Sequence, residues 1–119
     1  MTLDQDLLKL EKGFWTEDGD YYREHLEDSC LLALSEDMAG PTDKEEIAKS
    51  NPGKGMWTDV ELDEKGLAQL SDDSAILTYE ITCKKKDGTP YNALVSTGYV
   101  RRDGEWKMAF HQQTPLTKN

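Results

Sequence analysis

The sequence predicts an α+β domain, in which helices gather on one face of a largely antiparallel sheet. Two observations lead to this prediction. Residues 3–48 contain three segments with helical spacing or helix-start signals and one strand-like run, whereas residues 57–113 alternate as four strands joined by turns. A chain of 119 residues has the length of one domain and can bury its own core, so residues 1–119 are treated as a single unit.

The first helix is predicted over residues 3–16. Its apolar residues recur at helical spacing and form one broad face: Leu3, Leu7, Leu10 and Phe14. An acidic stretch then interrupts the pattern. Asp18 or Asp20 can cap a second short helix that runs through Leu26 and Glu27.

A strand and a third helix are predicted next. The run CLLALS, residues 30–35, is apolar on both parities and is therefore expected to be covered on both faces. The sequence AGP, residues 39–41, is expected to end this segment. Thr42 and Glu45 have the spacing of a capping box and predict a short helix over residues 42–48.

Four strands are predicted in the second half of the chain: 57–70 with a bend near 64–66, 75–83, 91–102 and 106–113. In the strand AILTYEITC one face is expected to be interior, and it carries Ala75, Leu77, Tyr79, Ile81 and Cys83. Asp103-Gly104 predicts a tight hairpin. The last two strands have apolar residues on both faces, so we expect helices on one face and a second subunit on the other.

Composition excludes several classes of partner. The chain has 24 Asp and Glu against 14 Lys and Arg, a net charge of −10, which repels nucleic acid and anionic membranes. It lacks a long apolar run and a signal-like start, so we expect a cytoplasmic protein. Cys30 and Cys83 are expected to be buried, reduced thiols, and no metal site or cofactor is predicted.

The sequence ALVSTGYVRRDGEWKMAFHQQTP, together with LLKLEKGFW and the order of elements, resembles the nuclear transport factor 2-like superfamily, above all its small stand-alone bacterial members of unknown function. The resemblance covers residues 3–116. It implies a cone-shaped, cystatin-like α+β fold, also found in ketosteroid isomerases and polyketide cyclases. In this fold a strongly curved, mixed or antiparallel sheet wraps around a long N-terminal helix and two short helices. It further implies an apolar internal pocket and a homodimer formed through the outer face of the sheet.

The catalytic residues of well-known enzymes with this fold are not matched. The steroid isomerases pair a tyrosine on the first helix with two acids on interior strand positions, whereas this helix offers Phe14 and Trp15 and the strand offers Tyr79 among apolar residues. The epoxide hydrolases need an Asp-Arg-Asp set in the pocket, and Arg101 and Arg102 lie at a hairpin end. The resemblance therefore does not by itself imply an activity.

His111 is the first candidate for chemistry, because a neutral imidazole in a pocket can act as a general base when an amide or a carboxylate orients it. Gln113 shares its parity. The structural alternative for His111 is a hydrogen bond within the strand or a place in the subunit contact. Gln112 and Gln113 could likewise bond backbone groups where the strand ends at Pro115.

Tyr79 is the second catalytic candidate, either as a donor to a ligand carbonyl or as a core residue that bonds a neighbour. The residues predicted to bind a ligand are Trp15, Tyr22, Met38, Trp57, Ser96 and Gln113. Ser96 and Tyr99 lie on opposite parities, and we expect Ser96 to face inward and Tyr99 to face the dimer partner. Asp37 and Asp59 are the acids expected nearest the pocket rim.

Two hypotheses for the function remain open at this point. In the first, a homodimer binds a small, largely apolar molecule, with isomerase-, hydratase- or cyclase-like acid-base chemistry on His111 and Tyr79. In the second, the chain is a non-catalytic assembly or regulatory module whose cavity is filled by Trp15, Trp57 and Met38. An open cavity above roughly 300 Å³ with converging polar groups would favour the first. The sequence does not identify the ligand or establish that the protein is an enzyme.

Overall fold

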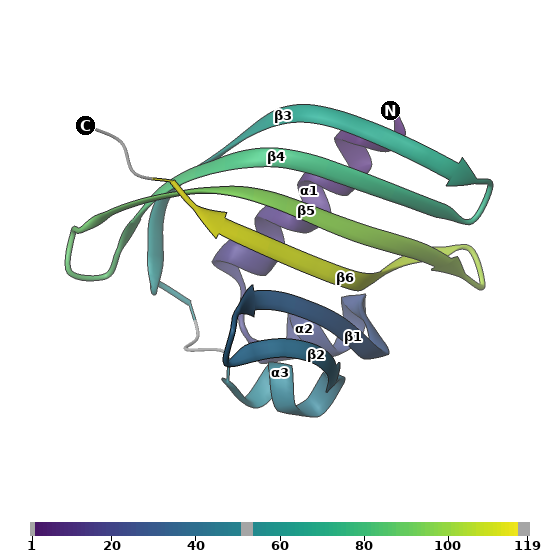
Figure 1. The fold of residues 1–119 in the computed structure, drawn as a ribbon, viewed down its shortest axis with the longest axis horizontal. Coiled ribbons are helices and arrows are strands. Elements are labelled where there is room, and N and C mark those ends of the chain that lie inside the picture. The colour runs from purple at the N-terminus through teal and green to yellow at the C-terminus, as the bar shows by residue number, and fades with distance from the viewer. Residues whose placement is uncertain (1, 51–53, 117–119) are drawn as a thin grey trace.

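A computed structural model describes residues 2–50 and 54–116 (Figure 1). Within these residues the helices are Leu3–Thr16 (α1), Gly19–His25 (α2) and Lys44–Ser50 (α3). The strands are Leu26–Ser35 (β1), Met38–Asp43 (β2), Trp57–Ser71 (β3), Ser74–Lys85 (β4), Pro90–Arg102 (β5) and Glu105–Pro115 (β6). The predicted α+β class is confirmed.

The strands form an open mixed sheet in the order β2-β1-β6-β5-β4-β3. β1 runs parallel to β6, and every other neighbouring pair is antiparallel. The long strands β3 to β6 arch over α1, while β1 and β2 lie with α2 and α3 at the other side of the molecule (Figure 1). No helix in the described part of the chain is both long and apolar enough to cross a bilayer.

The core lies between α1 and the concave face of the sheet. From α1 it contains Leu7, Phe14 and Trp15, which are at most 8% exposed. The face of β4 predicted to be interior is buried as expected, with Ala75, Leu77, Tyr79, Ile81 and Cys83 at most 2% exposed. Burial of each large apolar side chain contributes roughly 1.5 to 3 kcal/mol, so this layer fixes how the sheet curves around the helix.

The segment 39–41 does not end the strand region, contrary to the prediction. It belongs to β2, which pairs antiparallel with β1 through Leu31↔Pro41, Leu32↔Gly40 and Ala33↔Ala39. Proline and glycine are tolerated here because β2 is an edge strand, where a missing ladder donor costs little. The turn signals in the sequence therefore mark an edge rather than a loop.

The boundaries of two helices also differ from the prediction. α2 ends at His25 and β1 already begins at Leu26. The predicted capping box at Thr42 is replaced by Asp43, whose carboxylate accepts the backbone N–H of Glu45 at 3.0 Å. Aspartate and threonine serve equally as helix caps, so spacing alone could not select between neighbouring positions.

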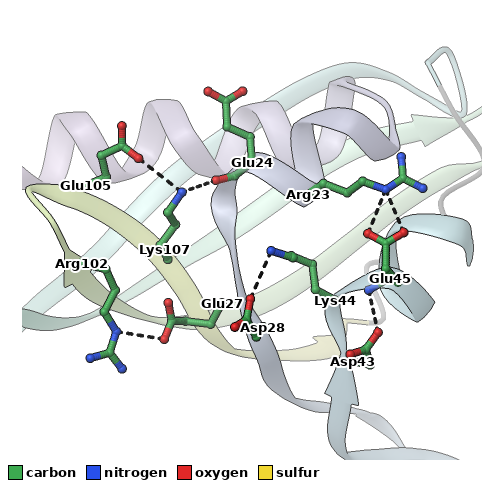
Figure 2. A network of polar contacts seen from close by, with 10 residues as sticks. All are labelled: Arg23, Glu24, Glu27, Asp28, Asp43, Lys44, Glu45, Arg102, Glu105 and Lys107. Carbon is green, nitrogen blue, oxygen red and sulfur yellow. Dashed lines mark hydrogen bonds and ion pairs between the residues drawn. The ribbon is translucent and has the colours of Figure 1, made fainter.

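Ion pairs on the surface join α2 to α3, α3 to β1, and the end of β5 to β1 (Figure 2). The closest N···O distances are 3.0 Å for Arg23–Glu45, 3.3 Å for Lys44–Asp28 and 3.1 Å for Arg102–Glu27. Exposed pairs of this kind contribute at most about 1 kcal/mol each. They orient the two short helices rather than stabilise the fold.

The parity of β5 is the reverse of the prediction. Tyr99 is 1% exposed and faces α1, whereas the hydroxyl of Ser96 lies 3.0 Å from that of Thr78 on the outer face. Tyr99 shares its parity with Ala93 and Val95, which are fully buried. A strand turns its more apolar set inward, and that set includes Tyr99.

Candidate functional site

A cavity of about 490 Å³ opens on the concave side of the sheet. Its wall is built by the C-terminal end of α1, by α2 and α3, by β1 and β2, by the start of β3, and by β6. The sheet diverges from α1 at this side, and β1, β2 and α3 enclose the space that results (Figure 1).

The floor and the mouth of the cavity differ in character. The floor is apolar and buried, and it consists of Phe14, Trp15, Leu26, Cys30 and Met108. The mouth is exposed, and it consists of Asp37, Met38, Ala39, Glu46 and Ser50. A molecule entering the cavity therefore passes polar and charged groups before it reaches apolar surface.

Aromatic rings form one wall. Trp15 of α1 and Trp57 of β3 meet edge to face, with ring centroids 5.3 Å apart and planes at 75°. Tyr91 packs on Trp57 at 5.1 Å, and Phe14 packs on Tyr22 at 5.1 Å. Because each ring packs against another ring, the aromatic side chains of this wall are fixed in position. They leave the cavity beside them open.

His111 lies on β6 with its side chain on the concave side, in register with Leu32 of β1 and Thr97 of β5. Its Nε2 is 3.0 Å from Oε1 of Gln113. The Nε2 of Gln113 in turn donates to the hydroxyl of Tyr91 at 2.7 Å. This chain orients the amide and, through it, the imidazole.

The same chain favours one tautomer of His111. The amide nitrogen of Gln113 is directed to Tyr91 and the amide oxygen faces His111; in this orientation the proton of the neutral ring belongs on Nε2 and the lone pair on Nδ1. Nδ1 is shielded from solvent and has no hydrogen-bond partner among the described residues. Burial lowers the pKa of His111 below its ordinary value of 6.5, against the opposing effect of the Gln113 bond, so the ring is neutral at pH 7.

A buried carboxyl group lies behind the aromatic wall. Glu11 of α1 is fully buried and accepts hydrogen bonds from the hydroxyls of Tyr79, at 2.6 Å, and Tyr99. The indole N–H of Trp15 donates to the Tyr79 oxygen at 2.9 Å. Thr97 is buried beside the same carboxyl group, although its hydroxyl makes no well-formed hydrogen bond among the described residues.

The environment of Glu11 raises its pKa from 4.5 to about 7. Desolvation is the larger cause, and the hydrogen bonds from Tyr79 and Tyr99 oppose it. The carboxyl also acts on Tyr21 and Cys30, and burial, aided by its charge, raises the pKa of each to about 12. Because no basic side chain contributes to the pKa of Glu11, desolvation prevails.

Sequence reasoning did not single out Glu11. The signal was present, because Glu11 falls four residues after Leu7 and three before Phe14, within the apolar face of the first helix. A carboxylate at such a position is either exposed at the edge of the helix's apolar face or buried together with hydrogen-bond donors. Tyr79 and Tyr99 supply those donors.

The structure brings most of the predicted site residues together. The cavity is lined by Trp15, Tyr22, Met38, Trp57, His111 and Gln113. Tyr79 does not line it, since Trp15 stands between the cavity and the Tyr79 hydroxyl, and Ser96 lies on the opposite face of the sheet. Asp37 is at the mouth as expected, whereas Asp59 is exposed on β3, 3.6 Å from Lys84, and outside the cavity wall.

Neither thiol forms a disulfide. Cys30, in the cavity floor, and Cys83 are both buried and free, and burial raises their pKa values to about 12 and about 11. The described residues contain no group of three or more His, Cys, Asp or Glu side chains placed to hold a metal ion. The polar groups that line the cavity include His111, its amide partner Gln113 and the acids Asp37 and Glu46 at the mouth.

No family profile and no curated protein matches this sequence. Solved structures do match it. A nuclear transport factor 2-like protein of unknown function from Prochlorococcus superposes with a TM-score of 0.72, at 18% identity over 100% of this chain and 97% of the other. The chain has the nuclear transport factor 2-like fold. The fold implied by the sequence resemblance is thereby confirmed.

Two other solved structures share the nuclear transport factor 2-like fold: one is an isomerase-like protein and the other is an association domain. A ketosteroid isomerase-like protein from Erwinia carotovora atroseptica gives a TM-score of 0.73, with 18% identity over 94% of this chain and 92% of the other. The association domain of C. elegans CaMKII gives 0.70, with 12% identity over 92% and 93%. At these identities the similarity establishes the fold alone, and the function has to be argued from the site.

Proposed function

We propose that the protein binds a small, largely apolar molecule in the cavity, with Nδ1 of His111 as its hydrogen-bond acceptor. The observation that carries the proposal is an unpartnered, solvent-shielded ring nitrogen on a residue that lines an apolar cavity of about 490 Å³. A buried polar atom without a partner costs about 1 to 3 kcal/mol. Because Nδ1 exposes almost no surface in this structure, a hydroxyl or N–H on the guest removes that cost only if the side chains around His111 shift on binding. The volume lies within the usual range of small-molecule sites, roughly 300 to 1,000 Å³.

Binding is better supported than isomerase-, hydratase- or cyclase-like turnover. The lowered pKa of His111 makes it a weak base, and an amide rather than a carboxylate orients it. Tyr79, the other catalytic candidate, donates to Glu11 behind the wall. The geometry therefore favours a role for His111 in recognition.

We further propose a homodimer formed through the outer face of the sheet. Large apolar side chains on that face are exposed, among them Leu31 (47%), Ile76 (37%) and Leu94 (37%). Phe110 of β6 packs beside Gly98 of β5 on the same face and adds apolar surface to it. An exposed apolar sheet face of this kind supports self-association more directly than it supports binding of an unrelated partner.

Calorimetric titration with 1-adamantanemethanol tests the binding proposal. This compact apolar alcohol is expected to bind with a dissociation constant on the order of 0.1 mM, which corresponds to about 0.5 kcal/mol for each of its roughly 12 non-hydrogen atoms, within the range that small ligands reach. Leu34→Trp, which places a larger side chain in the cavity wall, is expected to weaken binding at least about tenfold.

The matched control is Leu70→Trp. Leu70 is 64% exposed on β3 and lies outside the cavity wall, so the same substitution there is expected to leave the affinity unchanged. Absence of binding to the unmodified protein at millimolar concentrations would contradict the proposal. Equal affinity of the two variants would contradict it as well, because the alcohol would then bind elsewhere.

A further inference from the structure

We infer that the guest is a cationic amine with an apolar body, whose protonated nitrogen lies at the mouth of the cavity beside Asp37 and Glu46. The inference rests on the proposed function and narrows it to one class of ligand. Three features carry it: the hydrogen-bonding state of the polar groups that line the cavity, the charge at the mouth, and the aromatic wall.

Most of the hydroxyl and amide donors that line the cavity are already used within the protein. Thr42 donates to the carbonyl of Gly40 at 3.2 Å, and Ser50 donates to that of Ile47 at 2.9 Å. Tyr22 likewise donates to the carbonyl of Phe14 at 2.5 Å, and the amide of Gln113 donates to Tyr91. Of the polar donors in the wall, a carbonyl or carboxylate on a guest would find only the indole N–H of Trp57 and the second N–H of Gln113 unused among the described residues.

The charged groups left for a guest are acceptors. Asp37 and Glu46 present exposed carboxylates at the mouth, whereas the unpartnered Nδ1 of His111 is covered in this structure. Neither carboxylate forms an ion pair with any residue in 2–50 or 54–116. Their neighbours are engaged, since Glu45 pairs with Arg23 and Asp43 caps α3 (Figure 2). A guest that carries N–H donors and positive charge complements this set.

No Lys or Arg is among the described residues that line the cavity. Two basic side chains of the neighbouring helices are turned to other partners: Lys44 pairs with Asp28, and Arg23 pairs with Glu45 (Figure 2). Lys49 of α3 is exposed and lies outside the cavity wall. An anionic guest would meet two carboxylates without a counter-ion, in a protein of net charge −10. The potential at the mouth selects for cations.

The aromatic wall has the same preference. Trp15, Trp57 and Tyr22 line the cavity, and the faces of such rings carry negative electrostatic potential. An ammonium group within about 6 Å of a ring centroid is attracted to that face, and more strongly when it is partly desolvated. An apolar amine can therefore place its body on the buried floor and against these rings, while its charge faces the carboxylates at the mouth.

Three probes of one shape test the inference by calorimetry at pH 7: 1-adamantanemethylamine, 1-adamantanemethanol and 1-adamantanecarboxylate. The amine is expected to bind roughly tenfold more tightly than the alcohol, and the carboxylate roughly tenfold less tightly, as expected for two exposed charge contacts. In the double variant Asp37→Asn, Glu46→Gln the amine is expected to bind no better than the alcohol.

Glu36→Gln provides the control for overall charge. Glu36 is exposed, adjacent to Asp37 and outside the cavity wall, so this variant is expected to keep the preference for the amine. If the alcohol binds and the amine does not bind more tightly, the inference is overturned while the proposed function stands. The same holds if the double variant keeps the preference. Binding of none of the three probes would overturn both.

Discussion

Replacing Glu11 by alanine is expected to lower the free energy of unfolding by about 3 to 5 kcal/mol. The change removes a fully buried side chain and leaves the hydroxyls of Tyr79 and Tyr99 without their acceptor. Urea denaturation followed by circular dichroism measures the loss. Asp6→Ala, an exposed acid on the same helix, is the matched control and is expected to cost less than about 1 kcal/mol. Equal losses in the two variants would contradict a structural role for the buried network.

The raised pKa of Glu11 also predicts how stability depends on pH. The native state keeps this proton up to about pH 7, whereas the unfolded chain releases it near 4.5. Its contribution to stability is therefore complete below pH 4.5, declines as pH rises to 7, and is absent above. The difference corresponds to about 3 kcal/mol between the two ends of this range.

Glu11→Gln isolates this contribution, because glutamine does not titrate. Burial lowers the pKa values of His25 and His111, which makes stability rise with pH over part of the same range and masks the effect in the unmodified protein. The unmodified protein and the variant both retain the two histidines, so their effect cancels in the difference between the two free energies of unfolding. From about pH 4.5 to about pH 8, this difference is expected to change by about 3 kcal/mol in favour of the variant. A difference independent of pH would mean that Glu11 titrates normally.

A change of leucine to lysine on the outer face is expected to convert the proposed dimer to a monomer. Leu94 lies on β5 within the sheet, directly opposite Glu80 of β4, and the cost of desolvating an ammonium group in the proposed interface would oppose association even beside that carboxylate. Light scattering coupled to size exclusion should give a mass near twice 13.5 kDa for the unmodified protein and near 13.5 kDa for Leu94→Lys.

Leu70→Lys makes the same substitution at the β3–β4 hairpin, away from the centre of the face, and is expected to remain dimeric. A monomeric unmodified protein would leave the exposed apolar residues of the outer face without a role. A dimeric Leu94→Lys variant would place the interface elsewhere.

The elements with strong periodicity were predictable from the sequence. The first helix spans residues 3–16 as expected, and β4 buries the predicted face. A hydrophobic period of 3.6 or 2 residues predicts a helix or a strand wherever one face of the element packs against the core. The bend near 64–66 appears as a register shift between Glu64 and Gly66. These features depend on local pattern, which is what a single sequence records best.

Elements that depend on distant partners were not predictable. β2 is a strand because it pairs with β1, and β1 lies inside the sheet because it runs parallel to β6, the last strand of the chain. Local turn signals at residues 39–41 gave the opposite indication. Parallel pairing leaves no hairpin signature, so the sequence could not indicate which strand would lie beside β6.

The candidate site was predictable in part. The shared parity of His111 and Gln113 follows from strand geometry, and the aromatic residues of the wall follow from their size. The chain from His111 through Gln113 to Tyr91, and the place of Glu46 at the mouth, arise only when β6, β5 and α3 are packed together. Hydrogen-bonded contacts between elements leave no trace in residue spacing.

¹⁵N NMR of the imidazole nitrogens shows whether His111 offers an unprotonated Nδ1 to a guest in the cavity. Without a probe at pH 7, we expect Nδ1 of His111 to have the shift of an unprotonated nitrogen and Nε2 that of a protonated one. Saturating 1-adamantanemethanol should move the Nδ1 signal toward that of a hydrogen-bonded acceptor and leave His25, the other histidine, unchanged. A proton on Nδ1, or an Nδ1 signal that does not move at saturation, would contradict the account.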